Sequence, residues 1–204
     1  MTTSHDSTVV VSSYGPDAAR DQFDIVRSLY AEVYSEPPYV EGSDDVESFA
    51  TNDWPRRLTQ PGFRLVLAHI GHEAAGFAFG HGLEPNTLWW AGALDPLPAD
   101  LTTEPVGRTF AIIELGVRQQ FRRHGIARAL HAALLRERPE ERVTLLVRPE
   151  AEPARQLYES LGYTSVCRLR PYIDGPIYNC LLIRLSQGAS GRGGKSTRPV
   201  AVAD

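Results

Sequence analysis

Cysteine and lysine are scarce in this sequence. Only two cysteines occur among 204 residues, Cys167 and Cys180, and each lies in an apolar run with the character of a strand. Two cysteines cannot build the framework of several disulfides found in small secreted domains, so we expect two reduced, packed thiols; a single bridge between neighbouring strands stays open. Lys195 is the one lysine among 21 basic residues, so arginine carries nearly all of the positive charge.

Long apolar runs and a strong net charge are also missing. No run approaches the roughly 20 apolar residues that cross a bilayer, and the start, MTTSHDSTVVV, has neither a cationic segment nor a long apolar core. The formal net charge of -4 and the pI of 5.9 give no general attraction to nucleic acid. We therefore expect a cytoplasmic protein with no membrane and no nucleic-acid partner.

Composition and length favour one folded domain. Apolar residues make up 42% of the chain and charged residues 23%, which are ordinary values for a globular protein. We predict a single domain over residues 1–185. Residues 84–107 form an ordered flap within it, because that segment holds four prolines together with Trp89 and Trp90. Residues 186–204 are polar and rich in Gly and Ser, so we expect a disordered tail.

Periodicity predicts strands and helices in alternation. Apolar and alternating runs predict strands at 7–14, 63–70, 74–83, 109–117, 142–147, 163–169 and 177–185. Spacings of three to four residues predict helices after Pro16, through 44–58, after Gly125 and from about Pro153 to Gly162. The order of strand, helix and strand around Gly125 indicates a mixed α/β protein.

The run FRRHGIARAL (121–130) lies where a strand gives way to a helix. A helix start presents unpaired backbone N–H groups and the positive end of the helix dipole, which together suit an anion. Gly125 allows close approach of the backbone, and the arginines add charge. The run lacks the Gly-Lys-Ser/Thr of a P-loop and the three glycines of a dinucleotide fingerprint. Taken alone, such a run is more often a solvated helix start than a phosphate site.

Two longer stretches resemble one family. ELGVRQQFRRHGIARALHAALL (114–135) resembles the acetyl-CoA-binding motif of the GNAT superfamily of N-acetyltransferases, whose R/Q-x-x-G-x-G/A is matched by Arg122, Gly125 and Ala127. TLLVRPEAEPARQLYESLGYTSV (144–166) is similar to the strand, helix and LYE-x-LG-aromatic segment of the same superfamily. YAEVYSEPPY (30–39) and PGFRLVLA (61–68) resemble an actinobacterial-type subgroup, so the resemblance covers roughly residues 9–185.

The resemblance implies a GNAT fold, a mixed, twisted central sheet of about seven strands flanked by about four helices. It also implies acetyl-CoA as co-substrate, with its pyrophosphate on the backbone amides of residues 122–127 and its pantetheine arm between the strands at 109–117 and 142–147. The cofactor-binding residues would be Leu115, Val117, Arg122, Arg123, His124, Gly125, Ile126, Ala127 and Arg128. Many members have an asparagine where this chain has Ala151, which predicts the loss of one side-chain contact.

Acetyl transfer to an amine needs a proton acceptor, a proton donor and a group that polarises the thioester. We predict that Glu114 is the proton acceptor, because its apolar neighbours in TFAIIELGV should raise its pKa. The alternative is that Glu114 forms a buried ion pair with an arginine. Tyr158 in QLYESLGY matches the tyrosine that protonates the coenzyme A thiolate in many family members, although it would also suit plain core packing. By the same resemblance, the N–H at or near Val117 would polarise the thioester carbonyl.

Five residues are candidates for the acceptor pocket. Tyr34, Tyr39, His81, Trp89 and Trp90 would lie on the substrate side of the sheet in the family's topology. The two tryptophans could instead pack the flap onto the core, and His81 could be a second base or a surface residue at a strand end. The remaining histidines have no ligand spacing with carboxylates or cysteines, so we predict no metal.

The leading hypothesis is an N-acetyltransferase that moves an acetyl group from acetyl-CoA to a primary amine by direct attack in a ternary complex. The tryptophan-containing flap favours a partly closed pocket and therefore a small-molecule amine. Two alternatives stay open: acetylation of a protein N-terminus or lysine, and a non-catalytic acyl-CoA-binding sensor. The oligomeric state is open as well, a homodimer included.

Overall fold

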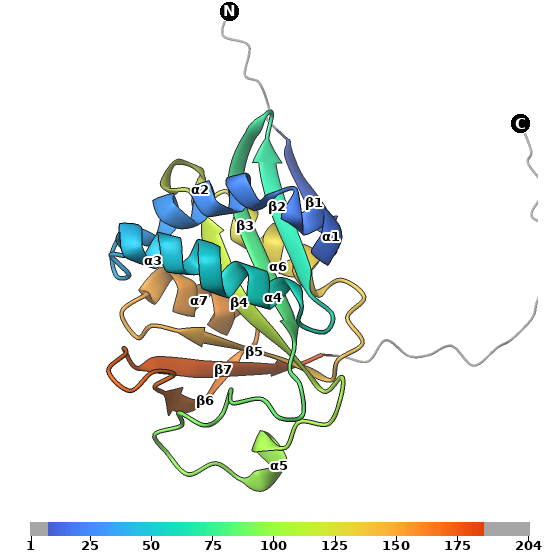
Figure 1. The fold of residues 1–204 in the computed structure, drawn as a ribbon, viewed down its shortest axis with the longest axis vertical. Helices are drawn as coiled ribbons and strands as arrows, with labels where there is room; N and C mark the ends of the chain where they lie inside the picture. The colour runs from blue at the N-terminus through green and yellow to red at the C-terminus, as the bar shows by residue number, and fades with distance from the viewer. Residues whose placement is uncertain (1–7, 186–204) are drawn as a thin grey trace, which may run out of the picture.

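Seven strands form one mixed sheet in the order β1-β2-β3-β4-β5-β7-β6 (Figure 1). The computed structural model describes residues 8–185, so the tail predicted at 186–204 lies outside the described residues. The strands are β1 (Val9–Tyr14), β2 (Arg64–Ile70), β3 (Glu73–Gly82), β4 (Thr109–Val117), β5 (Arg142–Val147), β6 (Thr164–Leu169) and β7 (Tyr178–Arg184). The predicted seven-stranded sheet is confirmed, with strand ends within two residues of those expected.

The parallel pair β4 and β5 is paired along only part of its length. Its register runs from Thr109 opposite Arg142 to Ile112 opposite Leu145, and there it stops. Both strands continue beyond this point, β4 to Val117 and β5 to Val147, without pairing to one another. All the other neighbouring strands are antiparallel. The sheet therefore opens as a wedge at the carboxyl ends of its two central strands.

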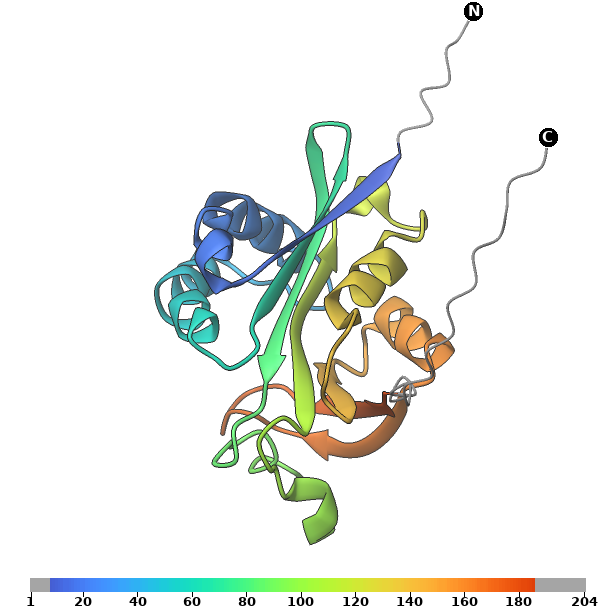
Figure 2. The same cartoon turned by 90° about the vertical axis from the view of Figure 1, so that its right-hand side faces the viewer.

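Helices cover both faces of the sheet (Figure 2). One face carries α1 (Pro16–Arg20), α2 (Phe23–Tyr34), α3 (Ser43–Ser48) and α4 (Trp54–Leu58), and the other carries α6 (Ile126–Leu135) and α7 (Glu152–Ser160). Successive side chains of β2 point to opposite faces of the sheet. Leu65 and Leu67 join the core beneath α1 to α4, whereas Val66 and Ala68 join the core beneath α6 and α7. No helix among residues 8–185 is long and apolar enough to cross a membrane.

The first two predicted helices are each subdivided. The one after Pro16 is interrupted between α1 and α2, and the one through 44–58 contains a π-helical turn, η1 (Phe49–Asp53). Phe49 and Trp54 are both 3% exposed, although five residues apart they would be roughly 140° apart on an α-helix. The wider π turn brings both rings onto the buried face, where their centroids lie 6.1 Å apart.

The flap at residues 84–107 packs beneath β6 and β7, and it contains a short helix, α5 (Ala99–Thr102), that we did not predict. Trp90 joins a small core with Cys167, Leu169 and Cys180, in which both cysteines are free thiols, as expected. Its indole Nε1 donates to Glu104 at 3.0 Å. The packing of Trp90 joins the flap to β6 and β7, and the bond to Glu104 links two parts of the flap to one another.

Candidate active site

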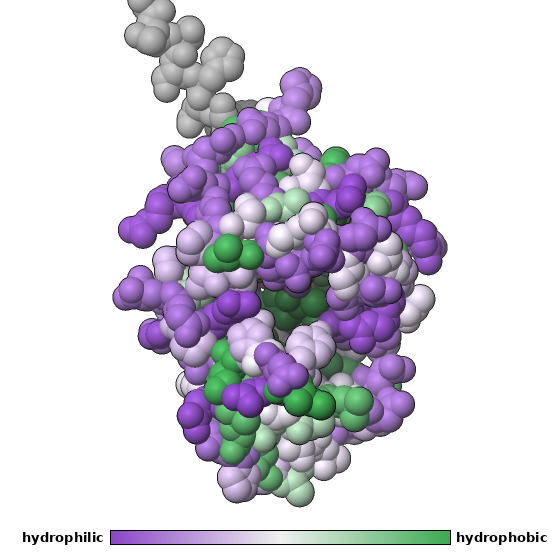
Figure 3. All heavy atoms as spheres, turned by 60° about the vertical axis from the view of Figure 1, so that its left-hand side comes forward, coloured by the Kyte–Doolittle hydropathy of each residue, from purple (hydrophilic) through white to green (hydrophobic). Residues whose placement is uncertain are grey.

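Two cavities meet at the wedge between β4 and β5. The smaller, about 280 Å³, surrounds Glu114, and the larger, about 590 Å³, extends along the start of α6. They share four lining residues, Tyr34, Tyr39, Leu115 and Ala154. Figure 3 shows a hollow with an apolar floor between hydrophilic rims on this side of the molecule. Ligands in the two cavities would therefore lie next to one another.

The larger cavity ends at the helix start that the sequence singles out. Gly125 is the N-cap of α6 with a φ of 76°, and no side chain caps the helix. The first N–H groups of α6 are therefore available to an anion. A Cβ built on Gly125 meets nothing within 4 Å, so the protein itself does not crowd this position. The glycine is needed because the loop requires a left-handed backbone here.

Two of the three arginines near this helix start form hydrogen bonds or ion pairs with other residues of the protein. Arg122 donates from Nε to the carbonyl of Val117 at 2.9 Å and forms an ion pair with Glu36 at 2.7 Å. Arg128 donates to the hydroxyl of Ser160 at 2.6 Å, which ties α6 to α7. The side chains of Arg123 and His124 are exposed. Ile126 is buried at the base of the helix and Ala127 lines the groove.

The backbone of β4 faces the wedge at Val117. The N–H of Arg118 donates to Ala75 of β3 at 2.9 Å. Because the N–H groups of successive strand residues point to opposite edges, the N–H of Val117 points away from β3, towards the open side. Ala151, at the start of α7, is 4% exposed and lines the same groove without offering a polar side chain.

Glu114 lies in the smaller cavity, next to an irregularity in β4. Phe79 pairs with Glu114 and Gly80 with Ile112, so Ile113 is an extra residue in β4, a β-bulge. The hydroxyl of Tyr34 donates to Oε2 of Glu114. Burial raises the pKa of Glu114 to about 8, and the Tyr34 hydrogen bond offsets only part of that rise. Within residues 8–185, no arginine forms an ion pair with this carboxyl group.

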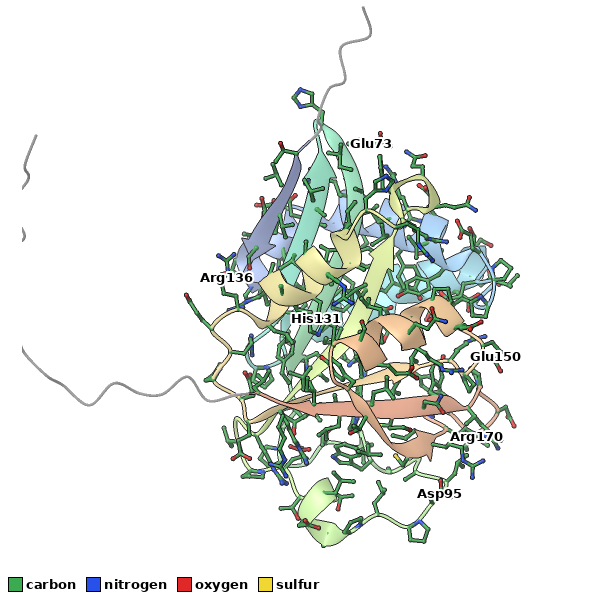
Figure 4. The ribbon with its side chains drawn as sticks, turned by 180° about the vertical axis from the view of Figure 1, so that it is seen from behind. Glu73, Asp95, His131, Arg136, Glu150 and Arg170 are labelled. Atoms are coloured by element: carbon green, nitrogen blue, oxygen red, sulfur yellow. The ribbon has the colours of Figure 1, made fainter. Side chains whose placement is uncertain are left out.

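Tyr158 comes from α7 on the other side of the same cavity. It is 6% exposed, and its ring packs edge-on against Tyr163 with centroids 5.4 Å apart. The Tyr163 hydroxyl is 2.9 Å from Nε2 of His131, which lies on α6 (Figure 4) and whose pKa burial lowers to about 4. Burial raises the pKa of Tyr158, so its phenol stays protonated. Packing against Tyr163 thus fixes a neutral O–H group beside the cavity.

The predicted acceptor residues divide into two groups. Tyr34, Tyr39 and Trp89 line the smaller cavity. His81 and Trp90 do not: Trp90 is packed within the flap core, and His81 is 4% exposed rather than at the surface. Burial lowers the pKa of His81 to about 4, and its Nε2 lies 3.0 Å from Nη1 of Arg57.

Two charged residues of the cavity were not predicted. Arg57 comes from α4 and Glu41 from the link between α2 and α3. In the sequence both look like ordinary solvated charges, WPRR in one case and YVEG in the other. Their closeness to aromatic residues is the one available signal. Among residues 8–185, no three His, Cys, Asp or Glu side chains gather in a way that would hold a metal ion.

A family model described as the acetyltransferase (GNAT) family matches residues 23–163. No curated protein matches the chain significantly. Among solved structures, the ribosomal-protein-S18-alanine N-acetyltransferase from Escherichia coli is similar with a TM-score of 0.59 and 17% identity, over 92% of this chain and 100% of that chain.

Two further structures are similar over most of both chains. The PaiA N-acetyltransferase from Thermoplasma acidophilum, in complex with coenzyme A, has a TM-score of 0.57 and 8% identity, over 87% of this chain and 99% of that one. Ard1 from Thermoplasma volcanium has a TM-score of 0.57 and 16% identity, over 88% and 99%. At these identities the likeness shows a shared fold. Because the family model spans the larger part of the sequence, the chain belongs to the acetyltransferase (GNAT) family.

Proposed function

We propose that the protein transfers an acetyl group from acetyl-CoA to the primary amine of a small molecule, by direct attack while both are bound. The observation that carries this proposal is the meeting of the two cavities, with Glu114 in one and the uncapped start of α6 at the end of the other.

The larger cavity fits coenzyme A. The free N–H groups at the start of α6 suit its pyrophosphate, and the unpaired stretch of β4 offers backbone groups to an extended amide-containing arm. Acetyl-CoA supplies an activated acetyl thioester when bound. The N–H of Val117, on the open edge of β4, is placed to polarise a carbonyl in the wedge.

The smaller cavity supplies the proton transfers. An amine that enters as an ammonium ion must lose a proton before it can attack, and Glu114 is the carboxylate beside it. Tyr158 keeps its proton at neutral pH and can give it to a departing thiolate. Among the residues that the structure describes, neither Cys167 nor Cys180 lines either cavity, which favours direct attack over an acetyl-cysteine intermediate.

The walls of the smaller cavity favour a small acceptor. Leu88 and Trp89 of the flap and Tyr172 of the loop before β7 contribute to the lining, so loops from two sides surround the space. A volume of about 280 Å³ is near the lower end of the range for small-molecule sites.

Titration calorimetry with acetyl-CoA, followed by thiol release over an amine library and mass spectrometry of the products, tests the proposal. We expect binding together with N-acetylated product from at least one small amine. Binding without turnover on any amine would indicate a sensor, and acetylation of peptides alone would move the acceptor to proteins. Absence of coenzyme A binding would contradict all three.

A further inference from the structure

Arg57 lines the smaller cavity, which we call the acceptor cavity, and its positive charge has no carboxylate partner there. Among residues 8–185, no carboxylate oxygen lies within 4 Å of its guanidinium, and its Nε is buried without a hydrogen-bond acceptor. The adjacent Arg56 is the contrasting case, because it is exposed and pairs with Asp53 at 2.7 Å. The chain thus neutralises the surface arginine and leaves the cavity arginine unpaired.

His81 forms a hydrogen bond with Arg57 and does not neutralise its positive charge. Nδ1 of His81 lies 2.9 Å from the carbonyl oxygen of Gly82, which can only accept, so Nδ1 carries the proton. Nε2 therefore accepts a hydrogen bond from Nη1 of Arg57, at 3.0 Å. A neutral imidazole fixes the position of the guanidinium, and the positive charge stays available to a ligand.

The same cavity contains two carboxyl groups, which become negative when they ionise. Glu114 and Glu41 both line it. Glu114 accepts a hydrogen bond from Tyr34, and Glu41 is hydrogen-bonded to Tyr30 while its Oε2 is buried without a donor. The buried guanidinium of Arg57 is costly to leave without a counter-charge unless a ligand supplies one. Two carboxyl groups suit an ammonium ion, and the guanidinium suits an oxyanion on the same molecule.

We propose that the acceptor is an amine that also carries an oxyanion, a carboxylate or a phosphate, and that Arg57 binds this oxyanion while His81 positions Arg57. The inference rests on the proposed acetyltransferase function and specifies the class of its substrate. Plain amines would then be poorer acceptors, because they leave the guanidinium desolvated and unpaired.

Matched pairs of amines test this inference. Tyrosine with tyramine and lysine with cadaverine differ by a carboxylate, and O-phosphoethanolamine with ethanolamine differs by a phosphate. We expect a preference in kcat/KM of about 10- to 100-fold for the anionic member of at least one pair, the size of one charge-assisted hydrogen bond. The pair that shows the preference identifies the anion.

Variants at two neighbouring arginines complete the test. Arg57→Gln should abolish the preference by raising KM for the anionic amine alone, Arg57→Lys should restore part of it, and Arg56→Gln should leave it unchanged. His81→Phe should raise the same KM if its role is positioning. Thermal unfolding of each variant checks that it folds.

Three outcomes count against the inference. Equal or better turnover of the plain amine in every pair would overturn it, as would a preference that persists in Arg57→Gln. A preference for the plain amine in all three pairs would assign recognition to the carboxyl groups alone. In all three, at least one amine is still acetylated, so the proposed function survives. Absence of acetylation across the whole panel and the library would remove the function, and this inference with it.

Discussion

The hydroxyl of Tyr34 donates a hydrogen bond to Oε2 of Glu114, and this bond joins α2 to β4 at the wall of the acceptor cavity. A neutral donor stabilises the ionised carboxylate less than a nearby arginine would. Burial therefore dominates and raises the pKa of Glu114 to about 8. A carboxyl group that titrates near physiological pH is well suited to accept and release a proton.

The first prediction concerns the pH dependence of catalysis. For the wild-type protein, kcat/KM should rise with pH, reach half of its maximum near pH 8 and level off above that, because Glu114 must lose its proton to act as a base. Glu114→Gln should lower kcat by about 10²- to 10⁴-fold and remove this rising limb of the pH profile. Tyr34→Phe should move the limb to higher pH, because it removes the hydrogen bond that lowers the pKa. An unchanged limb in Glu114→Gln would assign the titration to another group.

The second prediction concerns stability. The carboxyl of Glu114 has a pKa of about 8 in the folded protein and 4.5 as its ordinary value, so the folded state binds more protons between these two pH values. Stability should therefore fall as pH rises through this window, and no further above it. Glu114→Gln removes this pH-dependent contribution to stability. Its melting temperature relative to wild type should increase from pH 5 to pH 9, and a difference that stays constant across this range would contradict the assignment.

Tyr158→Phe should lower kcat far more than it changes the affinity for acetyl-CoA. The ring stays packed against Tyr163, so the substitution removes the hydroxyl and little else. Tyr163→Phe is the matched control: it removes the hydroxyl bonded to His131 and leaves the Tyr158 hydroxyl in place. Single-turnover kinetics and calorimetry separate the two effects. Equal kcat values for Tyr158→Phe and wild type, with chemistry limiting, would remove Tyr158 from the mechanism.

The coenzyme A site should depend on the backbone at Gly125 more than on the charge of Arg123. A side chain at a φ of 76° costs about 1–2 kcal/mol and reshapes the loop. Gly125→Val should therefore weaken coenzyme A binding by about tenfold or more, whereas Arg123→Ala should have a much smaller effect.

A control for strain alone is available in the hairpin between β2 and β3. Gly71 has a φ of 60° and open space around it, so Gly71→Val introduces comparable strain away from the groove. Its coenzyme A affinity should match wild type. Equal affinities for Gly125→Val and Arg123→Ala would show that charge matters as much as backbone shape.

Much of the fold could be predicted because each strand carries its own signal. β4 is apolar on both faces and β2 alternates between two cores, and these patterns are local. The π turn at Phe49–Asp53 carries no such signal, since it depends on where Phe49 and Trp54 meet the core. The helices predicted after Pro16 and through 44–58 were therefore placed correctly, but each is interrupted in the structure.

The same division holds for the candidate site. The cofactor loop and Tyr158 lie within contiguous motifs, and Glu114 is conspicuous as a charge inside an apolar strand. Arg57 and Glu41 come from separate segments on one face of the sheet, and only folding brings them to one cavity. The sequence could not indicate that His81 would bond to Arg57, because the two are 24 residues apart on different elements.

The last prediction concerns the buried ion pair that anchors the flap. Arg142 of β5 is 1% exposed and contacts Glu104 at 2.7 Å, while Thr109 donates to the other oxygen of Glu104 at 2.7 Å. Glu104→Gln leaves the guanidinium buried without a counter-charge, so it should lower the free energy of unfolding by about 3–5 kcal/mol. Urea denaturation measures this difference.

A surface pair between the flap and β6 is the matched control. Asp95 and Arg168 lie 3.3 Å apart with both side chains at least half exposed, so Asp95→Asn should cost less than about 1 kcal/mol. The double variant Glu104→Leu with Arg142→Met removes both buried charges together. It should recover a large part of the stability lost in Glu104→Gln, because well-packed apolar residues often replace a buried ion pair at little cost. A loss for Glu104→Gln no larger than that for Asp95→Asn would show that the flap is held by the packing of Trp90 and not by this ion pair.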